Sequence, residues 1–227
     1  MSAEFCLSEA HGRQGLGVLI LNRRISASRA MELSILGSAC FLDVETTGFS
    51  PRTDEIVELA MVLFEFDYAD GAIVKIVDTY SGLREPSVPI HPGASRVHGL
   101  TIDDLRGECL DAERVRALMA QTEFLIAHNA SFDRPFVCRI FPEAEAKPWV
   151  CSCREIPWRR YGFGSARLQE LTRACGIRAQ QSHRALDDVM DAIELLRQTN
   201  SITGTTFFSE LVRAGQADGR IAGGRGV

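Results

Sequence analysis

Asp43 and Glu45 lie two residues apart, directly after an apolar run from Ala39 to Leu42 that predicts a buried strand. On a strand, residues two apart point to the same side, so the two carboxylates share one face. Carboxylates held this close repel each other unless a cation or a proton neutralises them. Their oxygens suit hard divalent cations such as magnesium and manganese. A solvated strand end would use the same residues, so the pair alone leaves both interpretations open.

Two later stretches bring further acids to the ends of predicted elements. Asp133 comes at the start of a predicted helix, after an apolar strand and a polar turn. Asp188 lies where the chain enters an amphipathic helix, close to His183. Any one of these acids could instead satisfy free N–H groups at a helix start. Four such carboxylates together with a histidine favour metal-assisted hydrolysis.

His183 titrates near neutrality and can take a proton from an attacking water. On one continuous helix, His183 and Asp188 would point about 140° apart, because the helix has 3.6 residues per turn. We therefore expect His183 to precede the helix. A helix-capping or core histidine is the alternative. Sequence physics alone does not choose between Asp187 and Asp188 as the metal ligand.

Three ordered motifs resemble those of the DnaQ-like (DEDDh) 3′–5′ exonuclease family, which includes the proofreading subunits of bacterial DNA polymerase III. The motifs are Asp43-x-Glu45, His128-Asn129-Ala130-x-Phe132-Asp133 and His183-x-Ala185-x-x-Asp188. The segment 97–101 resembles a further family segment, and the similarity covers roughly residues 39–200. The resemblance implies an α/β fold: a ribonuclease-H-like mixed five-stranded sheet with helices on both faces.

The resemblance also implies an activity and a set of site residues. The expected enzyme is a 3′–5′ exonuclease that uses two Mg²⁺ or Mn²⁺ ions and releases nucleoside 5′-monophosphates from single-stranded or frayed DNA. The implied metal ligands are Asp43, Glu45, Asp133 and Asp188, and His183 is the implied general base; together these five form the expected catalytic set. The implied contacts to the terminal nucleotide are Val44, Thr46, Thr47, Gly48, His98, Asn129 and Phe132. For several of the nucleotide-contacting residues, a polar turn or core packing is an equally good interpretation.

Two alternatives stay open. The substrate could be the 3′ end of RNA or of a short oligoribonucleotide, since no residue reports recognition of the 2′-hydroxyl. The chain could also be a non-catalytic interaction module with a vestigial site. The sequence leaves polymerase association and oligomeric state undetermined.

Composition sets broad limits on the protein class. The chain has 227 residues, 45% of them hydrophobic, which suits one globular domain with a sizeable core. Its net charge of −5 argues against a protein that coats duplex DNA. No apolar run approaches the ~18 residues of a membrane helix, so we expect a cytoplasmic protein. The seven cysteines have scattered spacings that predict reduced thiols rather than structural zinc.

The order of predicted elements is three strands followed by alternating helices and strands. Strands are expected at 38–44, 55–66, 72–82 and 123–128, with an edge strand at 149–152. A hairpin turn is expected at Asp70-Gly71, and the proline-rich stretch 86–92 should be extended. Helices are expected from 101 and at 112–121, 132–141, 166–175, 184–199 and 207–214. We expect an N-terminal arm or short helix over 1–36, an exonuclease domain over 37–200, and a short helix with a flexible tail over 201–227.

Overall fold

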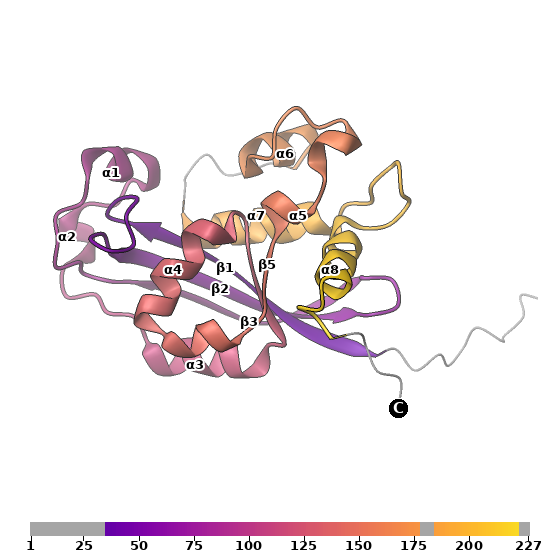
Figure 1. Cartoon of the computed structure of the whole chain (residues 1–227). Helices are drawn as coiled ribbons and strands as arrows, with labels where there is room; N and C mark the ends of the chain where they lie inside the picture. Colours follow the sequence, from indigo (N-terminus) through magenta and orange to yellow (C-terminus); the bar gives the residue numbers. More distant parts are fainter. Residues whose placement is uncertain (1–34, 178–183, 223–227) are drawn as a thin grey trace, which may run out of the picture. The chain divides into compact units, whose positions relative to one another are not determined.

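The computed structural model describes residues 35–177 and 184–222, and its centre is a five-stranded sheet (Figure 1). The strands are β1 (Leu36–Thr46), β2 (Ile56–Asp67), β3 (Ile73–Leu83), β4 (Phe124–Ala127) and β5 (Trp149–Cys151). Their order across the sheet is β3-β2-β1-β4-β5. The β1–β2 and β2–β3 pairs are antiparallel, whereas β4 pairs in parallel with β1 and β5. The sheet is therefore mixed, as predicted.

Eight α-helices connect and cover the strands of the described chain. They are α1 (Pro92–His98), α2 (Ile102–Leu105), α3 (Ala112–Gln121), α4 (Ala130–Ile140), α5 (Ser152–Glu155), α6 (Leu168–Ala174), α7 (Ala185–Arg197) and α8 (Phe207–Ala217). Two 3₁₀ turns lie at Pro142–Ala146 and Trp158–Tyr161. No helix in these described ranges is both long and apolar enough to cross a membrane.

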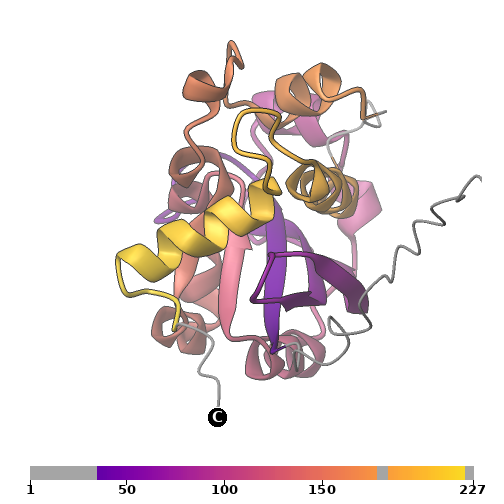
Figure 2. The same cartoon turned by 90° about the vertical axis from the view of Figure 1, so that its right-hand side faces the viewer.

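The central strand β1 is buried on both faces, so its alternating side chains enter two different cores. Cys40 and Leu42 pack with the apolar residues of α3 and α4. Ala39 and Phe41 point to the opposite face and pack with those of α7 and α8. Helices therefore cover both faces of the sheet, which confirms the predicted fold class (Figure 2). Asp43 and Glu45 continue the face of Ala39 and Phe41, the side on which α7 lies.

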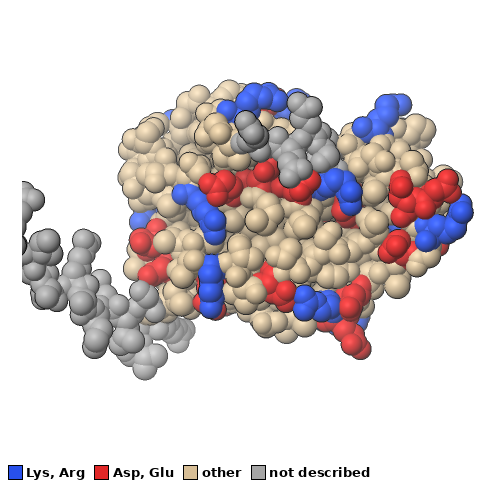
Figure 3. Space-filling view, turned by 180° about the vertical axis from the view of Figure 1, so that it is seen from behind, with Lys and Arg blue, Asp and Glu red and all other residues tan. Residues whose placement is uncertain are grey.

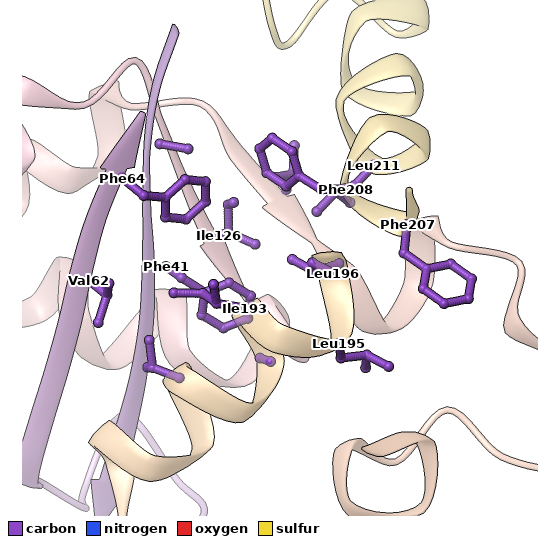
Figure 4. Close-up of a cluster of buried hydrophobic side chains, with 14 of the residues drawn as sticks. Phe41, Val62, Phe64, Ile126, Ile193, Leu195, Leu196, Phe207, Phe208 and Leu211 are labelled. Carbon is purple, nitrogen blue, oxygen red and sulfur yellow. The ribbon is translucent and has the colours of Figure 1, made fainter. Parts of the chain in front are cut away.

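Amphipathic helices complete the core on the α7 side. Ile193 and Leu196 project from α7 toward Phe41 and Ile126 of the sheet, and Phe208 of α8 packs edge-on against Phe64 with ring centroids 5.4 Å apart (Figure 4). Removing a buried phenylalanine from such a core typically costs about 3–5 kcal/mol. This packing fixes α7 against the sheet, and it therefore also fixes the position of the side chains in the first turn of α7.

Most predicted elements occur within a few residues of their expected ends. The exception is the proline-rich stretch, because Pro92 opens α1 instead of extending the chain. Proline is favoured at the first helical position, where its missing N–H costs nothing. The His91 side chain caps this helix by accepting the Gly93 N–H, and Gly99 ends it with φ of 76°. Helix α5 and the two 3₁₀ turns were not predicted.

The predicted hairpin turn gives a first testable expectation. Gly71 has φ of +71°, and a Cβ there would lie 2.5 Å from the Ser209 Cα of α8. Gly107 has φ of +78°, but a Cβ there would meet nothing within 4 Å. We expect Gly107→Ala to cost about 1 kcal/mol of backbone strain. Gly71→Ala should cost about 2–4 kcal/mol, because overpacking adds to the strain.

Urea unfolding of both variants beside the wild type measures this difference. Equal losses of stability in the two variants would show that α8 does not press on the turn.

Candidate active site

Three carboxylates converge where β1 ends and α7 begins. Asp43 and Glu45 come from β1, and Asp188 comes from the first turn of α7. One oxygen from each of the three lies within 4.8 Å of those of the others. All three side chains are half-buried. The predicted strand geometry therefore places Asp43 and Glu45 together, and Asp188 rather than Asp187 joins them.

Asp133 approaches the same place from α4. Asn129 precedes this helix with φ of 88°, a left-handed conformation that asparagine tolerates better than most residues. The turn brings Asp133 back to β1, where its Oδ1 accepts the Val44 N–H at 3.3 Å. Asp133 is only 2% exposed. It lies outside the group of three within 4.8 Å, but its charge raises the pKa of Asp43.

The four carboxyl groups keep their protons to a higher pH than free carboxyl groups do, and a bound cation would reverse this. Burial first, then the charges of Asp188 and Glu58, raise the pKa of Glu45 to about 8. Burial raises the pKa of Asp133 and that of Asp188 to about 7. Burial, followed by the charges of Asp133 and Glu45, raises the pKa of Asp43 well above its usual range. A divalent cation would remove this repulsion, and an all-oxygen donor set fits Mg²⁺ or Mn²⁺.

Glu58 and Arg184 form an ion pair beside these acids that the sequence analysis missed. Glu58 is on β2, directly across from Glu45, and is 1% exposed. Its carboxylate accepts hydrogen bonds from Arg184 Nε at 3.0 Å and Nη2 at 2.8 Å, and from the Ala185 backbone N–H. The pair thus attaches the first residues of α7 to the sheet. Glu58 sits within an apolar run, and a charge there without a nearby cation would be very costly.

His183 directly precedes this anchored arginine but lies outside the described residues. Its predicted place before the helix is consistent with α7 beginning at Ala185. Its role as a base stays a prediction.

A cavity of about 320 Å³ opens over the carboxylates. Six of the seven residues expected to contact a nucleotide line it, namely Val44, Thr46, Gly48, His98, Asn129 and Phe132. Thr47 does not line the cavity. It is fully buried, donates to Asp54 Oδ1 and accepts the Glu55 N–H, so it holds the turn. Gly48 is required by the same turn, because a Cβ there would lie 2.7 Å from the Asp54 carboxyl carbon.

Phe49 is a further cavity residue that the sequence analysis did not single out. Its side chain is 81% exposed, although it lines the cavity edge-on to Phe132, with ring centroids 6.5 Å apart. A single exposed apolar side chain is common on protein surfaces, so the informative feature of this one is its place at the cavity beside Phe132. An aromatic residue within the otherwise polar turn Thr46–Ser50 was the available signal.

Two histidines in the cavity wall are held neutral. His98 Nδ1 accepts the Leu100 N–H, so the proton is on Nε2, which is buried and without a partner. His128 Nε2 donates to the Ala166 carbonyl, and its Nδ1 faces the Ser152 hydroxyl. Burial lowers the pKa of both rings. His128 therefore organises the wall, whereas His98 offers an unused donor.

The arrangement of carboxylates and cavity agrees with comparisons to known proteins. The family model described as Exonuclease (RNase_T) matches residues 40–196. The chain belongs to this exonuclease family. The DNA polymerase III PolC-type of Listeria innocua is 31% identical over 159 residues, covering 66% of this exonuclease and 10% of the polymerase. The DNA polymerase III subunit epsilon of Treponema pallidum is 29% identical over 161 residues, covering 67% and 72% of the two chains.

Solved structures agree with the fold. Exonuclease X in complex with 5′ overhanging duplex DNA has a TM-score of 0.57 and 27% identity, covering 78% of this exonuclease and 99% of that chain. E. coli Exonuclease I in complex with a dT13 oligonucleotide has a TM-score of 0.60 and 20% identity, covering 73% and 41%. The predicted membership of an exonuclease family is confirmed. The chain spans about a tenth of the length of the PolC-type polymerases that it matches.

The raised carboxyl pKa values predict how Asp43→Asn changes stability. Between pH ~4 and ~8 the metal-free folded state holds protons that the unfolded chain has lost, so these groups contribute less stability as pH rises. Removing one of the repelling charges should therefore stabilise the metal-free protein. We expect the Tm of Asp43→Asn in EDTA to exceed that of the wild type, and the difference to grow from pH 5 to pH 8.

Asp103→Asn is the matched control. It makes the same chemical change at a side chain that is 76% exposed, where water screens the charge. Thermal scans by circular dichroism at several pH values measure all three proteins. A Tm difference for Asp43→Asn that is constant or shrinks with pH would contradict the assigned repulsion.

Proposed function

We propose that this protein is a metal-dependent 3′–5′ exonuclease. It acts on single-stranded or frayed DNA ends and releases nucleoside 5′-monophosphates. The observation that carries the proposal is the group of Asp43, Glu45 and Asp188 oxygens within 4.8 Å, at the floor of a nucleotide-sized cavity. Asp133 beside them supplies a fourth carboxylate. Structural acids at helix starts would have no reason to converge from three elements.

Asp43, Glu45, Asp133 and Asp188 would hold two Mg²⁺ or Mn²⁺ ions, which when bound stabilise charge on the attacking and leaving oxygens of a phosphodiester. His183 would take the proton of the attacking water. Arg184, fixed to Glu58, holds the chain next to His183 and leaves the histidine one residue from a rigid anchor. The Glu58–Arg184 pair is thus a positioning element for the base.

The cavity wall supports recognition of a terminal nucleotide. Phe49 and Phe132 present aromatic surface to a base, which stacks without regard to its identity. The unpartnered Nε2–H of His98 can donate to a sugar or phosphate oxygen. Asn129, which has a left-handed backbone, also lines the cavity with a polar side chain.

DNA as substrate is supported by relatives, and attack from the 3′ end by the resemblance of the sequence motifs, rather than by geometry. The epsilon subunit and Exonuclease X match over most of their own lengths, and the Exonuclease X structure holds 5′ overhanging duplex DNA. The polymerase names of the sequence relatives also support an association with a DNA polymerase. RNA is the alternative substrate, and the test below compares its digestion with that of DNA.

Digestion of 5′-labelled DNA and RNA oligomers tests the function. We expect shortening from the 3′ end that needs Mg²⁺ or Mn²⁺, stops in EDTA and is faster on DNA. A 3′-terminal block should prevent it, and Asp43→Ala should abolish it while the protein stays folded. Cleavage that ignores a 3′ block, or that persists in Asp43→Ala, would contradict the proposal.

His183→Ala should lower turnover by roughly 10²–10⁴-fold, the usual loss for a general base. Manganese binding should stay nearly intact, because the histidine acts on water and the carboxylates hold the ions. Single-turnover cleavage and a manganese titration of the same variant separate the two roles. A large loss of manganese affinity with little further loss of rate would make His183 a ligand instead.

A further inference from the structure

A second and larger cavity adjoins the carboxylate cavity. Its volume is about 680 Å³, and it shares His128, Asn129 and Asp188 with the first. The two cavities therefore form one continuous groove that begins at the carboxylates and passes between α4, α5, α6 and α7. The volume of the second cavity lies in the range of ligand-binding sites. A terminal nucleotide bound in the first cavity would leave the second one free.

The lining of this second cavity is mainly basic, although Glu170 is also part of it. It carries Arg154 from α5, Arg167 just before α6 and Arg173 from α6. Residues 152–175 contain five arginines against two glutamates, although the whole chain has a net charge of −5. Leu168 and Cys153 add apolar surface between the arginines. The first cavity is thus lined by carboxylates, whereas arginines outnumber acids in the lining of the second.

Several other arginines of the described chain are held in close ion pairs. Arg84, Arg114, Arg116 and Arg220 each contact a carboxylate within 3 Å. Among the residues that the structure describes, Arg154 and Arg173 form no ion pair. Arg167 meets Glu170 only at 3.6 Å, with its own side chain 84% exposed. The cations of the groove are therefore available to an anionic ligand.

On one other view of the molecule, basic side chains do not form such a path. The face seen from behind shows acidic and basic side chains interspersed, without a continuous basic surface (Figure 3). A polyanion that places its end at the carboxylates would meet repulsion until cations bind, and would gain attraction at the arginines. The distribution of charge along the groove thus matches a chain of phosphates that enters from the arginine end.

We infer that the arginine cavity binds the phosphates immediately 5′ of the scissile bond in a single strand. The inference rests on the proposed function, and it adds the path of the substrate beyond the terminal nucleotide. Arg154 and Arg173 neutralise the incoming phosphates, and Arg167 contributes a third charge. Because contacts to phosphate carry no sequence information, the groove should accept any base sequence.

The test compares a long substrate with one too short to reach the arginines. The long substrate is a single-stranded DNA of about eight nucleotides, and the short one is the p-nitrophenyl ester of thymidine 5′-monophosphate. For Arg154→Gln/Arg173→Gln we expect KM for the oligomer to rise about tenfold, as for two exposed charge-assisted contacts. The ester KM should change less than twofold.

Salt dependence gives a second readout. Each neutralised phosphate of a single strand contributes about −0.7 to the log–log slope of affinity against salt. Anisotropy titrations of the labelled oligomer should give a slope of about −2 for the wild type, and one shallower by about 1.4 for the double variant. Arg213→Gln is the matched control, since Arg213 is an exposed arginine of α8 outside the groove. It should change neither readout.

Two results would overturn the inference. Equal changes for ester and oligomer would place the arginines at the terminal nucleotide, and unchanged oligomer affinity with an unchanged salt slope would remove them from the path. Failure of the wild type to hydrolyse either substrate would instead contradict the proposed function. The anisotropy titration, which needs no turnover, still decides whether the arginines bind the strand.

Discussion

Mutual repulsion among carboxylates is the constraint on which the rest of this structure depends. Asp43, Glu45 and Asp188 are brought within 4.8 Å in a half-buried place where water shields them poorly. Left to themselves, the two elements that carry them would move apart. The long pairing of β1 with β2 and the apolar contact of α7 with the sheet prevent this. Part of the folding free energy thus holds together carboxylates whose repulsion is relieved by a cation or by protons.

The Glu58–Arg184 ion pair also affects the repulsion among these carboxylates. Glu58 adds a further negative charge across from Glu45, which alone would worsen the repulsion. Arg184 neutralises it and at the same time attaches the start of α7 to β2 through two guanidinium contacts. A bidentate pair fixes both distance and orientation, which a single hydrophobic contact would not. The helix that presents Asp188 is therefore held at its first residue as well as along its apolar face.

Sequence reasoning recovered what depends on local periodicity and failed where distant segments meet. The strand period placed Asp43 and Glu45 on one face, and the apolar spacing of α7 predicted the helix behind Asp188. Choosing Asp188 over Asp187 needed the family spacing. Thr47 lies next to cavity residues in sequence, yet its side chain turns into the loop because Asp54 offers it a partner.

The arginine groove could not be predicted for a related reason. Arg154 and Arg173 lie nineteen positions apart on different helices, and a solvated arginine is the commoner interpretation of each. Glu58 was hidden by the apolar residues around it. Phe49 was visible in the sequence, but its exposure depends on how the turn after β1 folds. In each case the information lies in tertiary contacts.

The fixed tautomers of His98 and His128 restrict how this enzyme senses acidity. Each ring has one nitrogen committed to a backbone group, and burial keeps both rings uncharged at neutral pH. At neutral pH they serve as uncharged hydrogen-bonding groups in the wall. Glu45, Asp133 and Asp188, whose pKa values are raised to about 8, 7 and 7, therefore titrate closer to neutrality than these two rings.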